Sequence, residues 1–115
     1  MLKQEDLTQF IGTETWYQHS LNKNVTYTDG VRYVAKEGGA YWLIDKIAIM
    51  QMEPKIKAEE FQVWTLKVKD DKGDITCDDG NGNIVFEEHI NFTDFPLDEI
   101  KFYFTNGVIL LPSEY

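Results

Sequence analysis

The hydrophobic pattern of this chain changes its period once, near Glu59-Glu60. Before that point apolar residues recur every three or four positions, as in amphipathic helices. After it they alternate with polar residues, as in half-buried strands. The change predicts an α+β fold, in which N-terminal helices pack on a C-terminal antiparallel sheet of about five strands. A chain of 115 residues suits one domain, so we assign 1–115 to a single unit.

Three segments of the first half have helical periodicity. Short helices are expected at 4–12 and at 31–39, each ending in glycine as a stop signal. The segment 16–30 between them is predicted to be irregular or weakly extended, with a turn at its Asp29-Gly30 end. The strongest pattern covers 40–52 and predicts a mostly buried central helix that ends before Pro54. Its apolar stripe consists of Leu43, Ile44, Ile47, Ala48 and Met50.

The second half contains strand-like segments at 61–69, 75–77, 83–92 and 100–111. The last of these is interrupted by Asn106-Gly107. An Asn-Gly pair between apolar runs is a strong hairpin signal, because both residues tolerate the positive φ of a type I′ turn. We therefore predict a tight hairpin there.

The stretch "TCDDGNGNIVF" (76–86) is the most motif-like part of the chain. A calcium loop starting at Asp79 would place Ile84 where glycine is needed and Ile90 where a bidentate glutamate is needed. A phosphate-binding loop would open a helix, not a strand, and two aspartates would repel the phosphate. We therefore expect no metal and no cofactor, and we interpret the stretch as a turn with an acidic tip.

This turn also bears on nucleophilic catalysis by the single cysteine. A two-residue turn within 79–82 places Cys77 opposite an even-numbered residue: Gly82, Ile84 or Phe86. His89 is odd-numbered, so its side chain points to the other face of the sheet. Cys77 is therefore predicted to be a buried core residue, and no catalytic residue is assigned.

The sequence allows two interpretations for each of two polar residues, Glu88 and His19. Glu88 shares a strand face with core residues, so it either pairs with a lysine at a sheet edge or is a functional carboxylate with a perturbed pKa. His19 is either an exposed or capping residue, or part of a pocket in a small enzyme or small-ligand binder. The residues of that alternative pocket are Glu14, Trp16, Tyr17, His19, Tyr41 and Asp45.

The charge of the chain lies in one half. Its formal net charge is −9, yet residues 1–69 carry nine acids and nine bases, so residues 70–115 hold the whole excess. Such a half would repel nucleic acids and anionic membranes. It is either a solvated surface or a contact for a basic partner, such as a nucleic-acid-binding protein. We favour a non-enzymatic protein-binding module of unknown oligomeric state that uses Asp70, Asp71, Asp74, Asp78, Asp79, Glu87 and Asp94.

The first ten residues carry acids where a signal peptide would be apolar, and the longest apolar run (40–44) is too short to span a bilayer. Both features favour a cytoplasmic protein without a membrane segment.

Several strings resemble a small bacterial family of unknown function, which is similar to proteins carried by genomes, plasmids and phages. The resemblance runs from about Leu7 to Tyr115 and implies a single domain, with a link to mobile elements or host interaction. It implies no site residues. The strings are "FIGTETWYQH", "YTDGVRYVAKEGGAYWLIDKIA", "EEFQVW", "CDDGNGN", "FTDFPL" and "LLPSEY".

Overall fold

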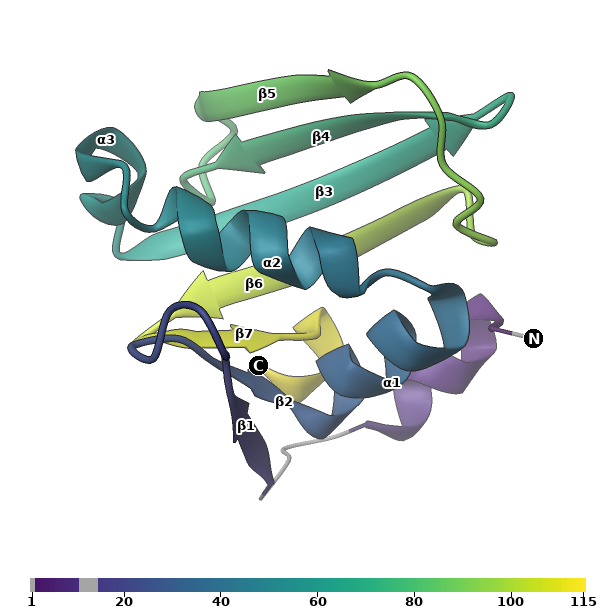
Figure 1. Ribbon diagram of the computed structural model, residues 1–115, viewed down its shortest axis with the longest axis horizontal. Coiled ribbons are helices and arrows are strands. Elements are labelled where there is room, and N and C mark those ends of the chain that lie inside the picture. Colours follow the sequence, from purple (N-terminus) through teal and green to yellow (C-terminus); the bar gives the residue numbers. More distant parts are fainter. Residues whose placement is uncertain (1, 11–14) are drawn as a thin grey trace.

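The computed structural model describes residues 2–10 and 15–115, and within them a seven-stranded sheet forms the centre of the molecule (Figure 1). The strands lie in the order β1-β2-β7-β6-β3-β4-β5, and neighbours are antiparallel except β2 and β7, which run parallel. Their bounds are β1 (Trp16–Gln18), β2 (Thr26–Thr28), β3 (Phe61–Lys69), β4 (Lys72–Asp78), β5 (Ile84–Ile90), β6 (Glu99–Thr105) and β7 (Val108–Leu110).

The α+β class is confirmed, but the predicted antiparallel sheet of about five strands was wrong in size and type. The two additional strands, β1 and β2, have three residues each and come from the segment predicted to be irregular. Three residues are too few to show a period of two, and the parallel contact of Thr26 and Tyr27 with Val108 and Ile109 leaves no local signal. The helices are also not all N-terminal, since η2 (Pro112–Glu114) follows the sheet.

The helix α1 (Asp29–Gly38) begins earlier than its apolar pattern predicted. The Thr28 hydroxyl accepts a hydrogen bond from the Val31 amide, so Thr28 is the N-cap, and Asp29-Gly30 opens a helix instead of forming a turn. Gly39 ends the helix with a φ of 64°, as expected of a C-terminal glycine. The N-terminal segment forms the shorter 3-10 helix η1 (Gln4–Gln9).

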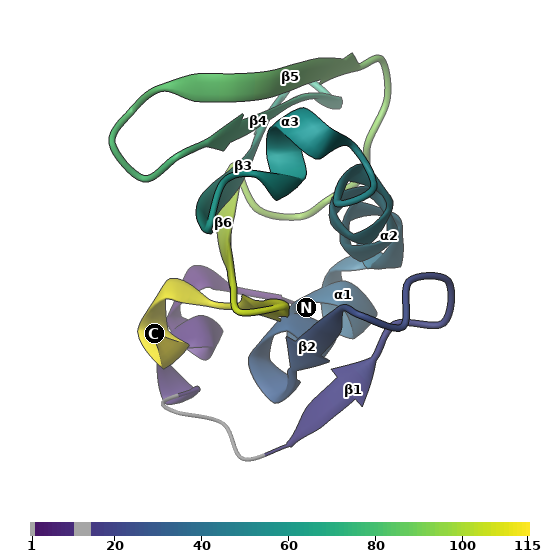
Figure 2. The same cartoon turned by 90° about the vertical axis from the view of Figure 1, so that its left-hand side faces the viewer.

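The central helix α2 (Tyr41–Met50) packs across the sheet, on the same face as α1 (Figures 1 and 2). Its buried stripe contains Leu43, Ile44, Ile47 and Ala48, as predicted. The helix is less enclosed than expected, because Tyr41 and Ile49 are each more than 40% exposed, at 44% and 45%. Pro54 does not follow directly on α2 but opens a separate turn, α3 (Pro54–Lys57).

The core lies between these helices and the inward-facing side chains of β3, β4 and β6. Trp64, Leu66, Ile75, Cys77 and Phe102 are each at most 2% exposed. Burying one large apolar side chain contributes about 1.5–3 kcal/mol, so this layer supplies most of the stabilisation of the fold.

The β4–β5 connection differs from the predicted two-residue turn. Asp78 pairs with Ile84, which leaves a five-residue loop, and a bulge between Cys77 and Asp78 shifts the register by one. A loop with an odd number of residues would by itself put Cys77 opposite an odd-numbered residue, but the bulge shifts the pairing back by one. Cys77 therefore lies opposite Phe86, and the His89 side chain points to the other face of the sheet. The predicted separation of Cys77 from His89 is therefore confirmed for a different reason.

The β6–β7 hairpin turns on Asn106 and Gly107, with φ angles of 53° and 76°, as the sequence predicted. The β3–β4 hairpin uses the same geometry with two aspartates. Asp70 and Asp71 have φ angles of 54° and 63°, and Lys69 pairs with Lys72 on either side of them. Neither turn residue is glycine, so the sequence lacks the usual signal for this type of turn.

Candidate functional site

The seven acidic residues of the predicted contact lie along the β4–β5 hairpin but do not form one cluster. One end of the hairpin holds Asp70, Asp71 and Asp94, and there the Thr93 amide donates a hydrogen bond to the Asp71 carbonyl. The other end holds Asp78 and Asp79. Between the two ends, the outer face of β4 and β5 carries Asp74 and Glu87. A seven-residue strand is about 23 Å long, so the acids form a strip of that length.

None of the seven acids forms an ion pair with lysine or arginine among the described residues, although Lys67 lies opposite Asp74 in the β3–β4 pairing and Lys72 begins β4. Within residues 2–10 and 15–115, Glu88 is the only carboxylate with a lysine nitrogen at ion-pairing distance, 2.9 Å from Lys46 Nζ. Asp74 Oδ1 lies 2.8 Å from His89 Nδ1, and both side chains are largely exposed. The strip therefore presents an excess of negative charge, not held in lysine or arginine ion pairs, on the solvent side of the hairpin.

Glu88 has the first of the two roles considered for it, a sheet-edge residue paired with a lysine. It lies on β5, an edge strand, faces α2 and pairs with Lys46 of that helix. The pair is about one-third exposed on both sides, which suits an edge position and gives it a modest energetic weight.

The acidic tip of the β4–β5 loop holds the turn together. Asp79 Oδ1 accepts from the amides of Asn81 and Asn83, and Oδ2 accepts from the Asn83 side chain. The hydrogen bond from the Asn83 side chain, with those from the backbone amides, lowers the pKa of Asp79 below its usual value. Asp78 likewise accepts from the Gly80 amide at 2.7 Å. These two carboxylates are thus partly occupied by their own loop.

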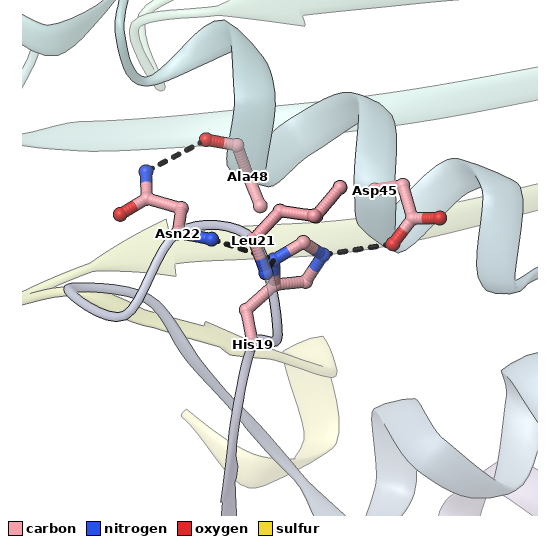
Figure 3. A network of polar contacts seen from close by, with 5 residues as sticks. All are labelled: His19, Leu21, Asn22, Asp45 and Ala48. Atoms are coloured by element: carbon pink, nitrogen blue, oxygen red, sulfur yellow. Dashed lines mark hydrogen bonds and ion pairs between the residues drawn. The ribbon is translucent and has the colours of Figure 1, made fainter.

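His19 is buried and joins the β1–β2 connection to α2 (Figure 3). Its Nδ1 accepts from the backbone amides of Leu21 and Asn22, each at 3.1 Å, so the ring proton is on Nε2, which donates to Asp45 Oδ1 at 2.8 Å. Asn22 adds a bond to the Ala48 carbonyl. His19 is a capping residue, as one interpretation held, but it is not exposed. Both ring nitrogens are engaged, and neither is free to act as a general base.

The other residues of the alternative pocket are only partly brought together. Glu14 lies outside the described residues. Tyr17 donates to Asp29 at 2.7 Å and accepts from Arg32, whose guanidinium lies 4.7 Å from the tyrosine ring centre. That hydrogen bond to Tyr17 raises the pKa of Arg32. Tyr41 is 44% exposed on α2, close enough to raise the pKa of Tyr27, an effect second to burial. Trp16 points to the opposite face of β1 from Tyr17.

Cys77 is completely buried, and burial raises the pKa of its thiol to about 12. A thiol with that pKa is not a nucleophile near neutral pH. The described residues also contain no group of three or more histidine, cysteine, aspartate or glutamate side chains placed to hold a metal ion.

A groove that the sequence did not predict lies on the outer face of β6 and β7. It has a volume of about 330 Å³, and Trp16, Leu110, Glu114 and Tyr115 are among its lining residues. Glu114 is only 9% exposed, and its Oε1 accepts from the Thr28 hydroxyl and from the Leu111 amide. One signal was present: glutamate three positions after the N-cap residue, here Leu111, can accept a hydrogen bond from its amide, which is one half of a capping box. Its contact with Thr28, 86 positions away, was not predictable from that pattern.

The described helices are all too short or too polar to span a bilayer. No curated protein and no solved structure matches the chain. One family model matches residues 1–115, which agrees with the single family indicated by the strings along the sequence. The chain therefore belongs to a family of unknown function, DUF6876.

Proposed function

We propose that this protein is a cytoplasmic, non-enzymatic binding module that recruits a basic protein through the β4–β5 hairpin. The observation that carries the proposal is the strip of carboxylates along this hairpin, which forms no ion pair with lysine or arginine among the described residues. Uncompensated charge on a solvent-facing surface speeds association with a partner of opposite charge. A nucleic-acid-binding protein of a host or mobile element presents such a basic surface.

The position of β5 at the sheet edge supports the same proposal. Its backbone on the side away from β4 has no strand neighbour among the described elements (Figure 1). An extended basic segment can hydrogen-bond along such an edge. Asp74 and Glu87 lie on the outer face of β4 and β5 and would attract the charges of that segment. Glu87 and Glu88 would repel a second copy of the same edge, so a basic partner is favoured over self-association.

The test begins with a partner identified by affinity capture and confirmed with purified components. Binding kinetics are then measured from about 50 to about 400 mM salt for the native protein and for the double variant Asp74→Lys/Glu87→Lys. We expect the association rate of the native complex to fall steeply with salt and that of the double variant to be lower by about tenfold or more at low salt. Glu37→Lys, on the exposed side of α1, is the matched control.

Equal association rates for the native protein and the hairpin variant would refute an electrostatic contact at this surface. The same conclusion follows if Glu37→Lys slows binding as much as the hairpin variant does, because the effect would then reflect net charge alone.

A further inference from the structure

Glu114, one of the residues lining the groove on β6 and β7, has a buried carboxylate oxygen without a hydrogen-bond partner. Glu114 Oε1 is fully used by the Thr28 hydroxyl at 2.7 Å and the Leu111 amide at 2.9 Å. Glu114 Oε2 is shielded from solvent, and no donor among residues 2–10 and 15–115 reaches it. Native structures rarely leave a buried carboxylate oxygen unpaired, because desolvation of the charge is costly. The oxygen therefore marks a place where a donor is needed.

The walls of the groove suit a cationic donor. Trp16 and Tyr115 border it and are unusually exposed, at 60% and 74%. Exposed aromatic faces attract ammonium and guanidinium groups. A cation also forms a stronger hydrogen bond to a carboxylate than a neutral donor does.

The floor of the groove suits the stem of such a cation. Val108 and Leu110 of β7 face the groove and are half-buried, whereas Ile109 between them is fully buried on the other face. An aliphatic chain laid over these two residues would remove further apolar surface from water.

We propose that this groove binds an organic cation with an aliphatic stem, an alkylguanidinium or alkylammonium group, whose charged end is held by Glu114 Oε2 between Trp16 and Tyr115. Because Oε2 is covered in the present arrangement, the carboxylate turns about its last torsion to meet the cation. That torsion is soft in glutamate.

The groove adjoins the acidic hairpin through a cluster of rings. Tyr115 contacts Phe61 and Tyr103, with ring centres 5.3 and 5.6 Å apart, and Phe61 lies against Gly80 of the β4–β5 loop. The C-terminal end and this loop lie on the same side of the molecule (Figure 2). An arginine or lysine side chain of a partner bound at the hairpin could therefore enter the groove. Binding of a free cation goes beyond the proposed function and does not depend on it; only this source of the cation rests on it.

The experiment is an NMR titration of the full chain with n-butylguanidinium and n-butylammonium, with n-butanol as the neutral probe. We expect saturable shifts of the Trp16 indole and Tyr115 ring signals with both cations and much weaker binding of n-butanol, by about tenfold or more. Glu114→Gln keeps an oxygen acceptor for Thr28 but removes the charge. This variant should weaken the binding of both cations by about tenfold. Glu37→Gln is the matched control and should leave binding unchanged.

Equal binding of n-butanol and the cations, or unchanged binding in Glu114→Gln, would overturn the proposal. Trp16→Ala provides an independent test if Glu114→Gln does not fold, since Trp16 is exposed. Loss of several-fold affinity for the cations is expected, and unchanged affinity would also overturn the proposal.

Two further arms separate the sources of the cation and the two proposals. A blocked arginine peptide that produces the same shifts identifies a protein side chain as a ligand, whereas shifts with n-butylguanidinium alone identify a free small cation. The variant Asp74→Lys/Glu87→Lys should lose the protein partner but retain n-butylguanidinium. Failure of the hairpin is thus distinguished from failure of the groove.

Discussion

The side-chain amides of Gln51 and Gln62 exchange two hydrogen bonds, 2.7 and 2.9 Å long, inside the protein. Gln62 is fully buried and also donates to the Ile56 carbonyl, while its oxygen accepts from the Trp64 indole at 2.8 Å. The pair thereby ties the end of α2 and the turn α3 to the first residues of β3. A buried polar network of this kind is stabilising only while all its members are satisfied.

Replacing Gln62 with leucine should destabilise the fold by about 3 kcal/mol or more, because the Trp64 indole, the Gln51 amide and the Ile56 carbonyl all lose a partner. Urea unfolding of Gln62→Leu, Gln51→Leu and the double variant measures this. The double variant should lose less than the sum of the single ones, since the two residues share their bonds. Gln9→Ala on exposed η1 is the control, with an expected change of about 0.5 kcal/mol or less. Strict additivity would contradict the coupling.

A second prediction concerns Gly30, which allows α1 and η2 to approach each other. A Cβ atom at this position would lie 2.7 Å from both Glu114 Oε1 and Leu111 Cδ1. Gly30→Ala should therefore cost about 1–3 kcal/mol through overpacking, although alanine favours helices. Thermal unfolding tests this, with Gly82→Ala as a contrast. Gly82 has a φ of 88° and no atom within 4 Å, so that substitution should cost about 1–2 kcal/mol through backbone strain alone. A neutral Gly30→Ala would show that η2 can move away from α1.

The parts of this fold that could be predicted from the sequence are those where one long periodic segment determines an element. The pattern at 40–52 and the alternation at 61–69 gave the central helix and the central strand, and Asn106-Gly107 gave a hairpin. Short elements were missed, because β1 and β2 obtain their stability from tertiary neighbours and not from a local pattern.

The candidate sites were harder to predict for a similar reason. Acidic residues can be counted in a sequence, but their distribution along a strip depends on strand register. The role of His19 depends on two backbone amides of its own loop, and that of Glu114 depends on Thr28 at the start of α1. No sequence spacing indicates such contacts.

A third prediction concerns the β3–β4 turn, where Asp70 and Asp71 both adopt positive φ angles. Asparagine followed by glycine is the preferred pair for this turn, so Asp70→Asn/Asp71→Gly should raise the free energy of unfolding by about 0.5–1 kcal/mol. Chemical denaturation measures the gain. The reverse substitution in the other hairpin, Asn106→Asp/Gly107→Asp, should be destabilising and serves as the reciprocal control. A loss of stability in the first variant would mean that the aspartate side chains contribute more than their backbone strain costs.

A fourth prediction follows from the pKa of Cys77, which burial raises from 9.0 to about 12. The folded protein holds this proton more tightly than the unfolded chain, so the contribution to stability is complete below pH 9 and is lost between about pH 9 and about pH 12. The free energy of unfolding should fall more steeply with pH in this window for the native protein than for Cys77→Ala. Comparing the two variants cancels the shared titration of lysines and tyrosines. Identical slopes would show that the thiol is not desolvated as the structure indicates.

The last prediction concerns Glu88, a charged residue on the inward face of the edge strand β5. Inward charges on edge strands oppose pairing with a second sheet, at some cost in packing. Glu88→Val should leave the stability of the monomer within about 1 kcal/mol, because the ion pair with Lys46 is partly exposed. The same variant should associate with itself through β5 in a concentration-dependent manner, which light scattering after size-exclusion chromatography measures. Glu37→Val removes a charge from α1, away from the sheet edge, and should remain in the state of the native protein. If both variants behave alike, Glu88 does not prevent self-association through β5. Glu87 and the net negative charge of the hairpin would then be the features that oppose pairing of this edge with a second copy.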